Sequence, residues 1–397
     1  MSAAERLTKI ILLPELKIEK IKVDGRFRAI YHCSKLPKQE YCPNCASGEY
    51  WVHEYREVTI RDEPLRGRQV TLKIKKRRLK CKSCKKTFNE PIPGIMKGRR
   101  FTEKFRKSLL WACQNFRNLK DVKKAYRCSN DMIYKALYES LQLNLKRKLN
   151  YQWPSTIGID EHAFGRSVKA RKTKFVTMLV DFKNKRPMEL VEGRTGAELK
   201  YALKHIPGRE NVSFVALDLS DPYKKFVTEF FPNAEMVADK FHVLRLLNPH
   251  ILKRRKEIAG NRANWRVRML LLRSGKKLDY WERKTLWEYL ERYPELKELY
   301  AFKESLHGFY RIKGYKRAQS ALTKMTDRMA KSKLKEIKTL RKTLMKWRNE
   351  ILNYFKTGIT NARTEGFNNV AKVLKRNGYG YSSFENYRLR VLNSAIT

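Results

Sequence analysis

The sequence has no uninterrupted apolar run that approaches the ~20 residues needed to span a bilayer. Its first residues, MSAAERLTKIILLPELKIEK, contain only the short apolar core IILL and no small-residue cleavage pattern. The first absence argues against a membrane protein, and the second argues against a secretory signal. We therefore expect a protein with no membrane partner that works outside the oxidising compartments where disulfides form.

Acidic residues are scarce relative to basic ones. The 397 residues include 40 Asp and Glu but 89 Lys and Arg, which gives a formal net charge of +49. A charge of this size repels itself unless a polyanion neutralises it, and nucleic acid is the natural polyanion. A highly charged solvated surface, or adaptation to an unusual cytoplasm, ranks below that interpretation. Since 42% of the residues are hydrophobic, the chain can bury a core.

Cysteines are few and odd in number, seven in all, and four of them form two CxxC pairs. Without an export signal, this pattern predicts metal binding and not disulfides. Two such pairs hold tetrahedral zinc with no open coordination position, so we expect a structural ion. The predicted ligands are Cys42, Cys45, Cys81 and Cys84, with His53 as an alternative ligand.

The pattern of apolar and charged residues divides the chain into an N-terminal region, residues 1–150, and a core that follows it. Residues 1–95 alternate apolar and charged side chains, which predicts an N-terminal β-hairpin followed by the zinc-binding domain. Residues 96–150 have helical periodicity, and Asn118 and Ser129 are placed to cap the second and third helices. Three short helices with a tight connection resemble a helix-turn-helix DNA-binding domain, although such a unit also packs without touching DNA.

If this unit reads DNA, its contacts come from the start of the third helix, because recognition helices use their N-terminal residues. The predicted DNA-binding residues are Asn130, Asp131, Tyr134 and Lys135.

From residue 151 onward the pattern of strands and helices indicates an α/β domain. In residues 151–242, three apolar strands (TIGID, KFVTMLVDF and RPMELVEG) precede a helix, the strand VSFVALDL, a second helix and the strand AEMVAD. That order predicts a mixed sheet. Residues 243–357 have helical spacing throughout and predict an all-α insertion, and residues 358–397 contain a last helix.

Acidic residues stand at the ends of two predicted strands. Asp160 ends one apolar strand and Asp218 ends another, where a functional group meets solvent from a rigid support. Glu365 lies early in the last helix. Three converging carboxylates repel one another unless divalent cations compensate, and two Mg²⁺ or Mn²⁺ ions would do so during phosphoryl transfer. Spacing alone leaves three other acids open as alternatives, namely Glu161, Asp181 and Asp221.

Asp239 and His242, in VADKFHV, admit two interpretations. Asp239 ends a predicted strand and His242 follows one helical turn later. The pair is either a helix N-cap with a partly buried histidine or an active-site support that orients a carboxylate or a DNA end.

Three segments of the sequence resemble a known family. GIDEHAF, ALDLSDPYKKFVTEFFPNAEMVADKFHVLRLLN and TNARTEGFNNVAKVLKRNGYGYSSFENYRLRVL are similar to the insertion-sequence transposases of the ISL-three type. The resemblance implies an α/β ribonuclease H-like core with a mixed sheet, interrupted by an all-α insertion and preceded by a small zinc-binding β unit and a helix-turn-helix domain. It also implies a DDE triad, carried over to Asp160, Asp218 and Glu365. Asp239 and His242 match the family's D-x-x-H element.

The resemblance implies a function as well. The front domains would bind terminal inverted repeats, and the core would cut a phosphodiester with metal-activated water before the freed 3′-hydroxyl attacks target DNA. Double-stranded DNA and a second subunit, in a homodimer or larger synaptic complex, are the implied partners, in the prokaryotic cytoplasm near the nucleoid. Two rival hypotheses are a non-enzymatic DNA-binding regulator and a ribonuclease H-type nuclease acting on RNA–DNA hybrids.

Overall fold

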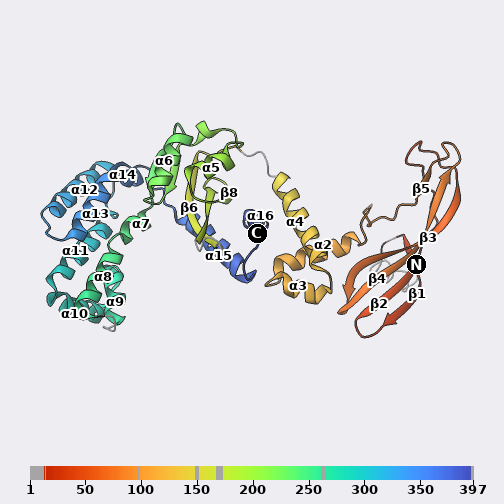
Figure 1. The fold of residues 1–397 in the computed structure, drawn as a ribbon, viewed down its shortest axis with the longest axis horizontal. Helices are drawn as coiled ribbons and strands as arrows, with labels where there is room; N and C mark the ends of the chain where they lie inside the picture. The colour runs from red at the N-terminus through yellow and green to blue at the C-terminus, as the bar shows by residue number, and fades with distance from the viewer. Residues whose placement is uncertain are drawn as a thin grey trace. The chain divides into compact units, whose positions relative to one another are not determined.

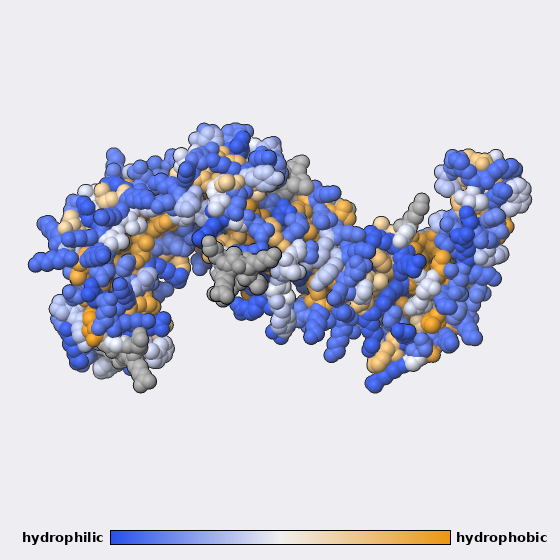
Figure 2. Space-filling view, viewed as in Figure 1, coloured by the Kyte–Doolittle hydropathy of each residue, from blue (hydrophilic) through white to orange (hydrophobic). Residues whose placement is uncertain are grey.

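The computed structural model describes Leu13 and residues 15–96, 98–147, 152–166, 173–260 and 265–394. They belong to two compact units, Met1–Asn144 and Leu145–Thr397, each of which is described by itself. The predicted domain boundary between residues 150 and 151 lies outside the described residues. None of the described helices is long and apolar enough to cross a membrane. Hydrophilic residues cover most of the face seen in Figure 2.

The first unit begins with a twisted sheet (Figure 1). β1 (Leu16–Asp24) and β2 (Arg28–Lys35) form the predicted hairpin, and β3 (Tyr50–Leu65) and β4 (Arg68–Cys81) form a longer one. β2 pairs with β4 in parallel, and the short β5 (Thr87–Asn89) pairs antiparallel with the C-terminal part of β4. The strand order is β1-β2-β4-β3. Alternate residues of β4 are buried, so one face of the sheet forms a core.

Three helices follow this sheet, as the sequence predicts. They are α2 (Glu103–Asn115), α3 (Leu119–Tyr126) and α4 (Asn130–Arg147). The side chain of Asn118 accepts a hydrogen bond from the first turn of α3, and the Ser129 hydroxyl accepts one of 3.2 Å from the Met132 N–H in α4. Both predicted caps are therefore confirmed.

The second unit contains the predicted mixed sheet. β6 (Thr156–Arg166), β7 (Thr173–Asp181) and β8 (Arg186–Glu192) form an antiparallel meander. β9 (Phe214–Leu217) and β10 (Glu235–Ala238) are parallel to β6, and the strand order is β10-β9-β6-β7-β8. In this order β6 is the central strand, with the parallel β9 on one side and the antiparallel β7 on the other.

Helices cover both faces of this sheet. α5 (Gly196–Leu203) and α6 (Asp221–Phe230) share one core with Leu179 of β7. α15 (Ala362–Asn377) and α16 (Phe384–Asn393) share another core with the neighbouring Met178. Because successive side chains of a strand point to opposite faces, the two cores lie on opposite sides of the sheet. The domain thus has three layers.

The all-α insertion consists of eight described α-helices between β10 and the last two helices, and no strand occurs in residues 240–260 and 265–357. Its core is continuous with the core under α5 and α6. The helices are α7 (Lys240–Arg245), α8 (Asn248–Ala259), α9 (Trp265–Leu272), α10 (Tyr280–Glu291), α11 (Pro294–Phe309), α12 (Tyr315–Ala330), α13 (Lys335–Lys346) and α14 (Arg348–Thr357).

Gly158 allows α15 to lie directly against β6. A Cβ at this position would overlap the Thr364 hydroxyl oxygen and lie 2.7 Å from Oδ1 of Asn361, both on or next to α15. Gly158→Ala is therefore expected to push α15 away and to destabilise the fold by about 1–3 kcal/mol, measured by denaturant or thermal unfolding. Gly165→Ala on the same strand is the control, because nothing lies within 4 Å of its Cβ. Equal stability of the two variants would contradict this packing.

Candidate metal centres

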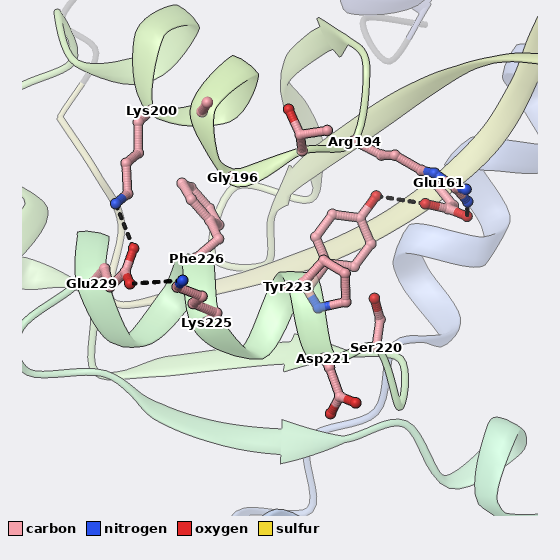
Figure 3. Close-up of a pocket in the computed structure, with 13 residues that line it drawn as sticks. Glu161, Arg194, Gly196, Lys200, Ser220, Asp221, Tyr223, Lys225, Phe226 and Glu229 are labelled. Atoms are coloured by element: carbon pink, nitrogen blue, oxygen red, sulfur yellow. Dashed lines mark hydrogen bonds and ion pairs between the residues drawn. The ribbon is translucent and has the colours of Figure 1, made fainter.

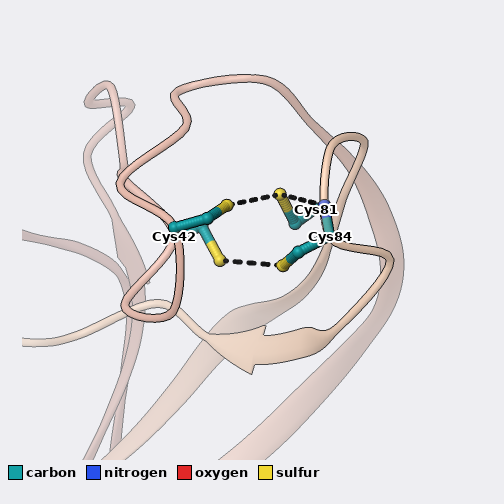
Figure 4. A group of neighbouring side chains, drawn as sticks. Cys42, Cys81 and Cys84 are labelled. Carbon is teal, nitrogen blue, oxygen red and sulfur yellow. Dashed lines mark hydrogen bonds between the residues drawn. The ribbon is translucent and has the colours of Figure 1, made fainter.

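Four cysteines of the first unit converge as predicted (Figure 4). Their sulfurs all lie within 4.8 Å of one another, with 3.6 Å between Sγ of Cys42 and Cys84 and 3.5 Å between Sγ of Cys45 and Cys81. Zinc bonded tetrahedrally at ~2.3 Å places its sulfurs ~3.8 Å apart, close to these distances. His53, the alternative ligand, is exposed on β3 and is not a member of the cluster.

Backbone N–H groups favour the thiolate form of these cysteines. The N–H of Cys84 lies 3.5 Å from Sγ of Cys81, and this bond is the main cause that lowers the pKa of Cys81 to about 6. The N–H of Asn44 is the main cause that lowers the pKa of Cys42. For Cys45 the backbone N–H of Ser47 also favours the thiolate, but hydrogen bonding to the Cys81 sulfur opposes it, and the pKa of Cys45 is raised to about 11. One cysteine of each CxxC turn, Cys42 and Cys81, therefore favours the thiolate that metals bind.

A second cluster lies at the edge of the mixed sheet where the parallel strands β9 and β10 end. The prediction that Asp160 ends its strand is wrong, because β6 continues to Arg166 and only its parallel pairing with β9 stops, at Gly158 and Ala216. Two residues after that pair, Asp160 and Asp218 are close enough for the charge of Asp218 to act on Asp160. Ala238 is in register with Leu217, so Asp239 also comes opposite Asp218. Parallel strands in register thus bring three aspartates, far apart in sequence, to one edge.

His242 joins this cluster from α7. Asp239 precedes the helix, and His242 is in its first turn, with Nδ1 2.8 Å from Oδ2 of Asp239 and 2.9 Å from Oδ1 of Asp218. The contacts to Asp218 and then Asp239 raise the pKa of His242 to about 10. The geometry of a hydrogen bond is met only for Asp239, so Oδ1 of Asp218 is a buried oxygen without a hydrogen-bond partner among the described residues.

Asp160 is held in place by two donors. The N–H of Glu161 donates to Oδ1 over 2.8 Å, and the side-chain amide of Asn368 donates to Oδ2 over 2.7 Å. Burial, and next the negative charge of Asp218, raise the pKa of Asp160 to about 6. Two neighbouring carboxylates in this environment gain from a cation between them.

Glu365 is in the first turn of α15 and is exposed. Its carboxylate makes no hydrogen bond or ion pair with any described residue, although its backbone N–H donates to the carbonyl of Asn361. Four residues before it, the N–H of Asn361 donates to Asp239 over 3.3 Å, and three residues after it, Asn368 donates to Asp160. Residues spaced by three and four lie on one side of a helix. Glu365 therefore lies within one turn of both of these contacts on α15, without a direct contact to the cluster.

The three alternative acids lie apart from this cluster. Asp181 accepts hydrogen bonds from Asn184 in the turn after β7, and Asp221 is exposed and ion-paired with Lys346.

Glu161 points to the opposite face of β6 from Asp160. It accepts a hydrogen bond of 2.8 Å from the Tyr223 hydroxyl and lies 3.2 Å from Nη1 of Arg194 (Figure 3). These residues line a hollow of about 900 Å³ between α5 and α6. Its cations are offset by Glu161 and Glu229, so it is not a strongly charged site.

The predicted DNA-contacting residues form one exposed face of α4. Asn130, Asp131, Tyr134 and Lys135 are exposed, while Ile133 and Leu137 are buried. Lys135 and Asp131 form an ion pair of 3.2 Å, which is surface-exposed and therefore weak.

The cluster also contains residues that sequence reasoning did not assign. Asn361 and Asn368 stand in the NARTEGFNN segment, and His162 stands in GIDEHAF. The asparagines on either side of Glu365 are the signal that could have identified the first two. No local pattern pointed to His162, because its partners lie more than 200 residues away.

Comparisons with known proteins cover nearly the whole chain. A family model described as a transposase of the ISL3 type matches residues 157–391, and a model described as the zinc-finger of transposase IS204/IS1001/IS1096/IS1165 matches residues 38–84. The transposase for insertion sequence element IS1001 of Bordetella parapertussis is 23% identical over 380 residues, 92% of this chain and 91% of that protein. Among solved structures, the Drosophila P element transposase strand transfer complex has a TM-score of 0.39 at 10% identity, covering 74% of this chain and 91% of that chain.

Proposed function

This chain belongs to the ISL3-type family of insertion-sequence transposases, and we propose that Asp160, Asp218 and Glu365 form its DDE catalytic triad. The observation that carries the proposal is the proximity of Asp160 and Asp218, two residues beyond the last parallel pair of β6 and β9, with Asn368 of α15 bonded to Asp160. Membership of a transposase family implies DNA cleavage and strand transfer. The assignment of catalysis to these three carboxylates, and of a two-metal mechanism to them, is the proposal.

The residues fit catalytic Mg²⁺ or Mn²⁺. Asp218 has a buried oxygen without a hydrogen-bond partner among the described residues, and burial, followed by the repulsion from Asp218, raises the pKa of Asp160. Carboxylate oxygens are the ligands that these hard cations prefer. Asp160, Asp218 and Glu365 would hold two ions, which supply activation of the attacking oxygen and stabilisation of the leaving oxygen. Being exposed, Glu365 is free to turn toward the cations.

Asp239 and His242 support this triad. Asp239 accepts the hydrogen bond of His242 and keeps the imidazole beside Asp218. The two carboxylates beside His242 favour its positively charged form, and a cation next to the cut site suits a DNA phosphate. We assign Asp239 to orienting His242, and His242 to orienting Asp218 or the DNA end.

The proposed reaction has two steps on one scaffold. A phosphodiester at the end of the element is hydrolysed, and the freed 3′-hydroxyl then attacks target DNA in a direct transesterification, without a covalent enzyme intermediate. We assign the scaffold as a ribonuclease H-like core, supported by the β10-β9-β6-β7-β8 order with three antiparallel and then two parallel strands. The proposed domains remain 1–95, 96–150, 151–242, 243–357 and 358–397.

The first unit is proposed to bind the ends of the element. The four-cysteine cluster would carry one structural zinc ion, and α2, α3 and α4 would form a helix-turn-helix with α4 as the recognition helix. The basic composition of the chain supports a polyanionic partner. Double-stranded DNA of element ends and target, and a homodimer or larger synaptic complex, are the proposed partners.

A double variant tests α4. Tyr134→Ala combined with Lys135→Ala is expected to weaken binding to the terminal repeats by about 10–100-fold, because each good base contact contributes ~1–3 kcal/mol. Non-specific binding should change much less. The measurement is fluorescence anisotropy on matched specific and scrambled duplexes at one salt concentration. Equal losses on both duplexes would contradict a role in sequence reading.

The function itself is tested with the full chain, Mg²⁺ and DNA bearing the element's ends. We expect metal-dependent nicks that leave 3′-OH groups at the junction, followed by joining to a second duplex, and no product in excess EDTA. Cleavage of RNA–DNA hybrids without strand transfer would favour the ribonuclease H-type nuclease. End binding without metal-dependent cleavage would favour the regulator.

A further inference from the structure

We infer that a buried chain of three side chains, Tyr387, His162 and Asn368, positions the carboxylate of Asp160. This inference rests on the proposed function of Asp160 and adds the residues that orient it. The three side chains come from α16, β6 and α15. All three are at most 3% exposed, so water does not compete for their hydrogen bonds.

The distances describe an unbroken chain. The Tyr387 hydroxyl lies 2.8 Å from Nε2 of His162, and Nδ1 of His162 lies 2.9 Å from Oδ1 of Asn368. The amide nitrogen of Asn368 then lies 2.7 Å from Oδ2 of Asp160. Asp160 and His162 are two residues apart on β6, so they point to the same face of the sheet.

The direction of each hydrogen bond follows from chemistry. An ionised Asp160 only accepts, so Asn368 must present its NH₂ group to it and its oxygen to His162. His162 must then donate from Nδ1. A neutral ring then accepts at Nε2 from the Tyr387 hydroxyl, which also lies 3.2 Å from the carbonyl oxygen of Ala371. When the Tyr387 hydroxyl donates to Nε2 it favours the Nδ1–H tautomer of His162, and that tautomer favours the amide orientation of Asn368 that presents NH₂ to Asp160.

Losing any link frees the next group to reorient. Without the Tyr387 hydroxyl, the proton of His162 can move to Nε2, and Nδ1 would then face the oxygen of Asn368 without a hydrogen. The side-chain amide of Asn368 would then be free to flip. Its oxygen would face the carboxylate of Asp160, and the two would repel each other. Such outer partners of metal ligands typically change metal affinity by 10–100-fold.

The experiment compares variants by their metal dependence. Asn368→Ala, Tyr387→Phe and His162→Leu are each expected to raise the Mg²⁺ concentration for half-maximal end cleavage by about 10-fold or more. They should weaken Mn²⁺ binding by the full chain, measured by calorimetry, to a similar extent. Asn369→Ala is the matched control, because Asn369 is the exposed neighbour of Asn368 on the same helix.

His162→Asn separates positioning from folding. Its amide places an N–H donor where Nδ1 stood, so metal dependence near that of the unsubstituted protein is expected, in contrast to His162→Leu. Both variants lose the Tyr387 partner, so a purely structural role would affect them alike. If the unsubstituted chain binds Mn²⁺ and cleaves, but the three variants have unchanged metal dependence, the inference is overturned and the proposed function stands. A chain that neither binds Mn²⁺ nor cleaves would overturn the proposed function with it.

Discussion

Asp218→Asn is expected to lower cleavage at the element's ends by on the order of 10³-fold or more, while binding to those ends stays the same. Asparagine has nearly the shape of aspartate, so β9 and the neighbouring α7 should keep their packing. It removes the negative charge that faces Asp160 and His242, and with it the attraction for a divalent cation. Single-turnover cleavage with saturating Mg²⁺ measures the effect.

Asp221→Asn provides the matched control. Asp221 lies three residues further on and is also acidic, but it is exposed and pairs only with Lys346 among the described residues. Its cleavage rate should stay within about 2-fold of the unsubstituted protein, since an exposed ion pair contributes little. An Asp218→Asn protein that still mobilised a marked element would exclude Asp218 from catalysis and favour the non-enzymatic regulator.

Cys81→Ser is expected to remove zinc from the first unit and to abolish binding to the element's ends. Cys81 is the last residue of β4 and contacts both the other CxxC turn and the N–H of Cys84. Structural zinc provides ~10–16 kcal/mol of apparent binding energy to small domains, which is more than a small sheet can replace. Metal analysis should find one zinc per chain before the substitution and none after it, and protease sensitivity between residues 36 and 95 should rise.

Cys33→Ala controls for the loss of a cysteine as such. Cys33 is buried in the core of the first sheet and is not a member of the zinc-binding cluster. This variant should keep its zinc and its affinity for the ends, although a small core cavity will cost some stability. Retention of both zinc and end binding in Cys81→Ser would show that the cluster does not hold the metal.

Local patterns were sufficient for the elements that carry the site. Apolar runs such as those of β7 and β9 are strands because both faces of the sheet are covered, and their positions were predicted from periodicity alone. The caps at Asn118 and Ser129 depend on residues within one turn. The paired cysteines likewise needed only short-range spacing, since each CxxC turn presents two sulfurs to one ion.

The choice among neighbouring acids was not available from spacing. Asp160 and Glu161 are adjacent in sequence, and only strand alternation together with the packing of α15 places Asp160 beside Asp218 and Glu161 beside Tyr223. Glu365 was predicted from the family resemblance. Its helix, α15, lies beside the cluster, but the Glu365 carboxylate makes no direct contact with Asp160 or Asp218. For Asp239 and His242, where two interpretations stood open, the structure shows a hydrogen-bonded pair that also borders Asp218.

Of the three acids named from the sequence, Asp218 follows the end of its strand as predicted and Glu365 came from the motif, whereas Asp160 lies within β6, which continues to Arg166. The surroundings of all three were decided by the tertiary fold. Asn368, His162 and Tyr387 meet because α15 and α16 pack on β6, across more than 200 residues of sequence. Sequence alone determined the elements, because periodicity, caps and cysteine spacing act over a few residues. Tertiary structure decided which side chains orient the carboxylates, because that depends on register and on contacts between distant segments.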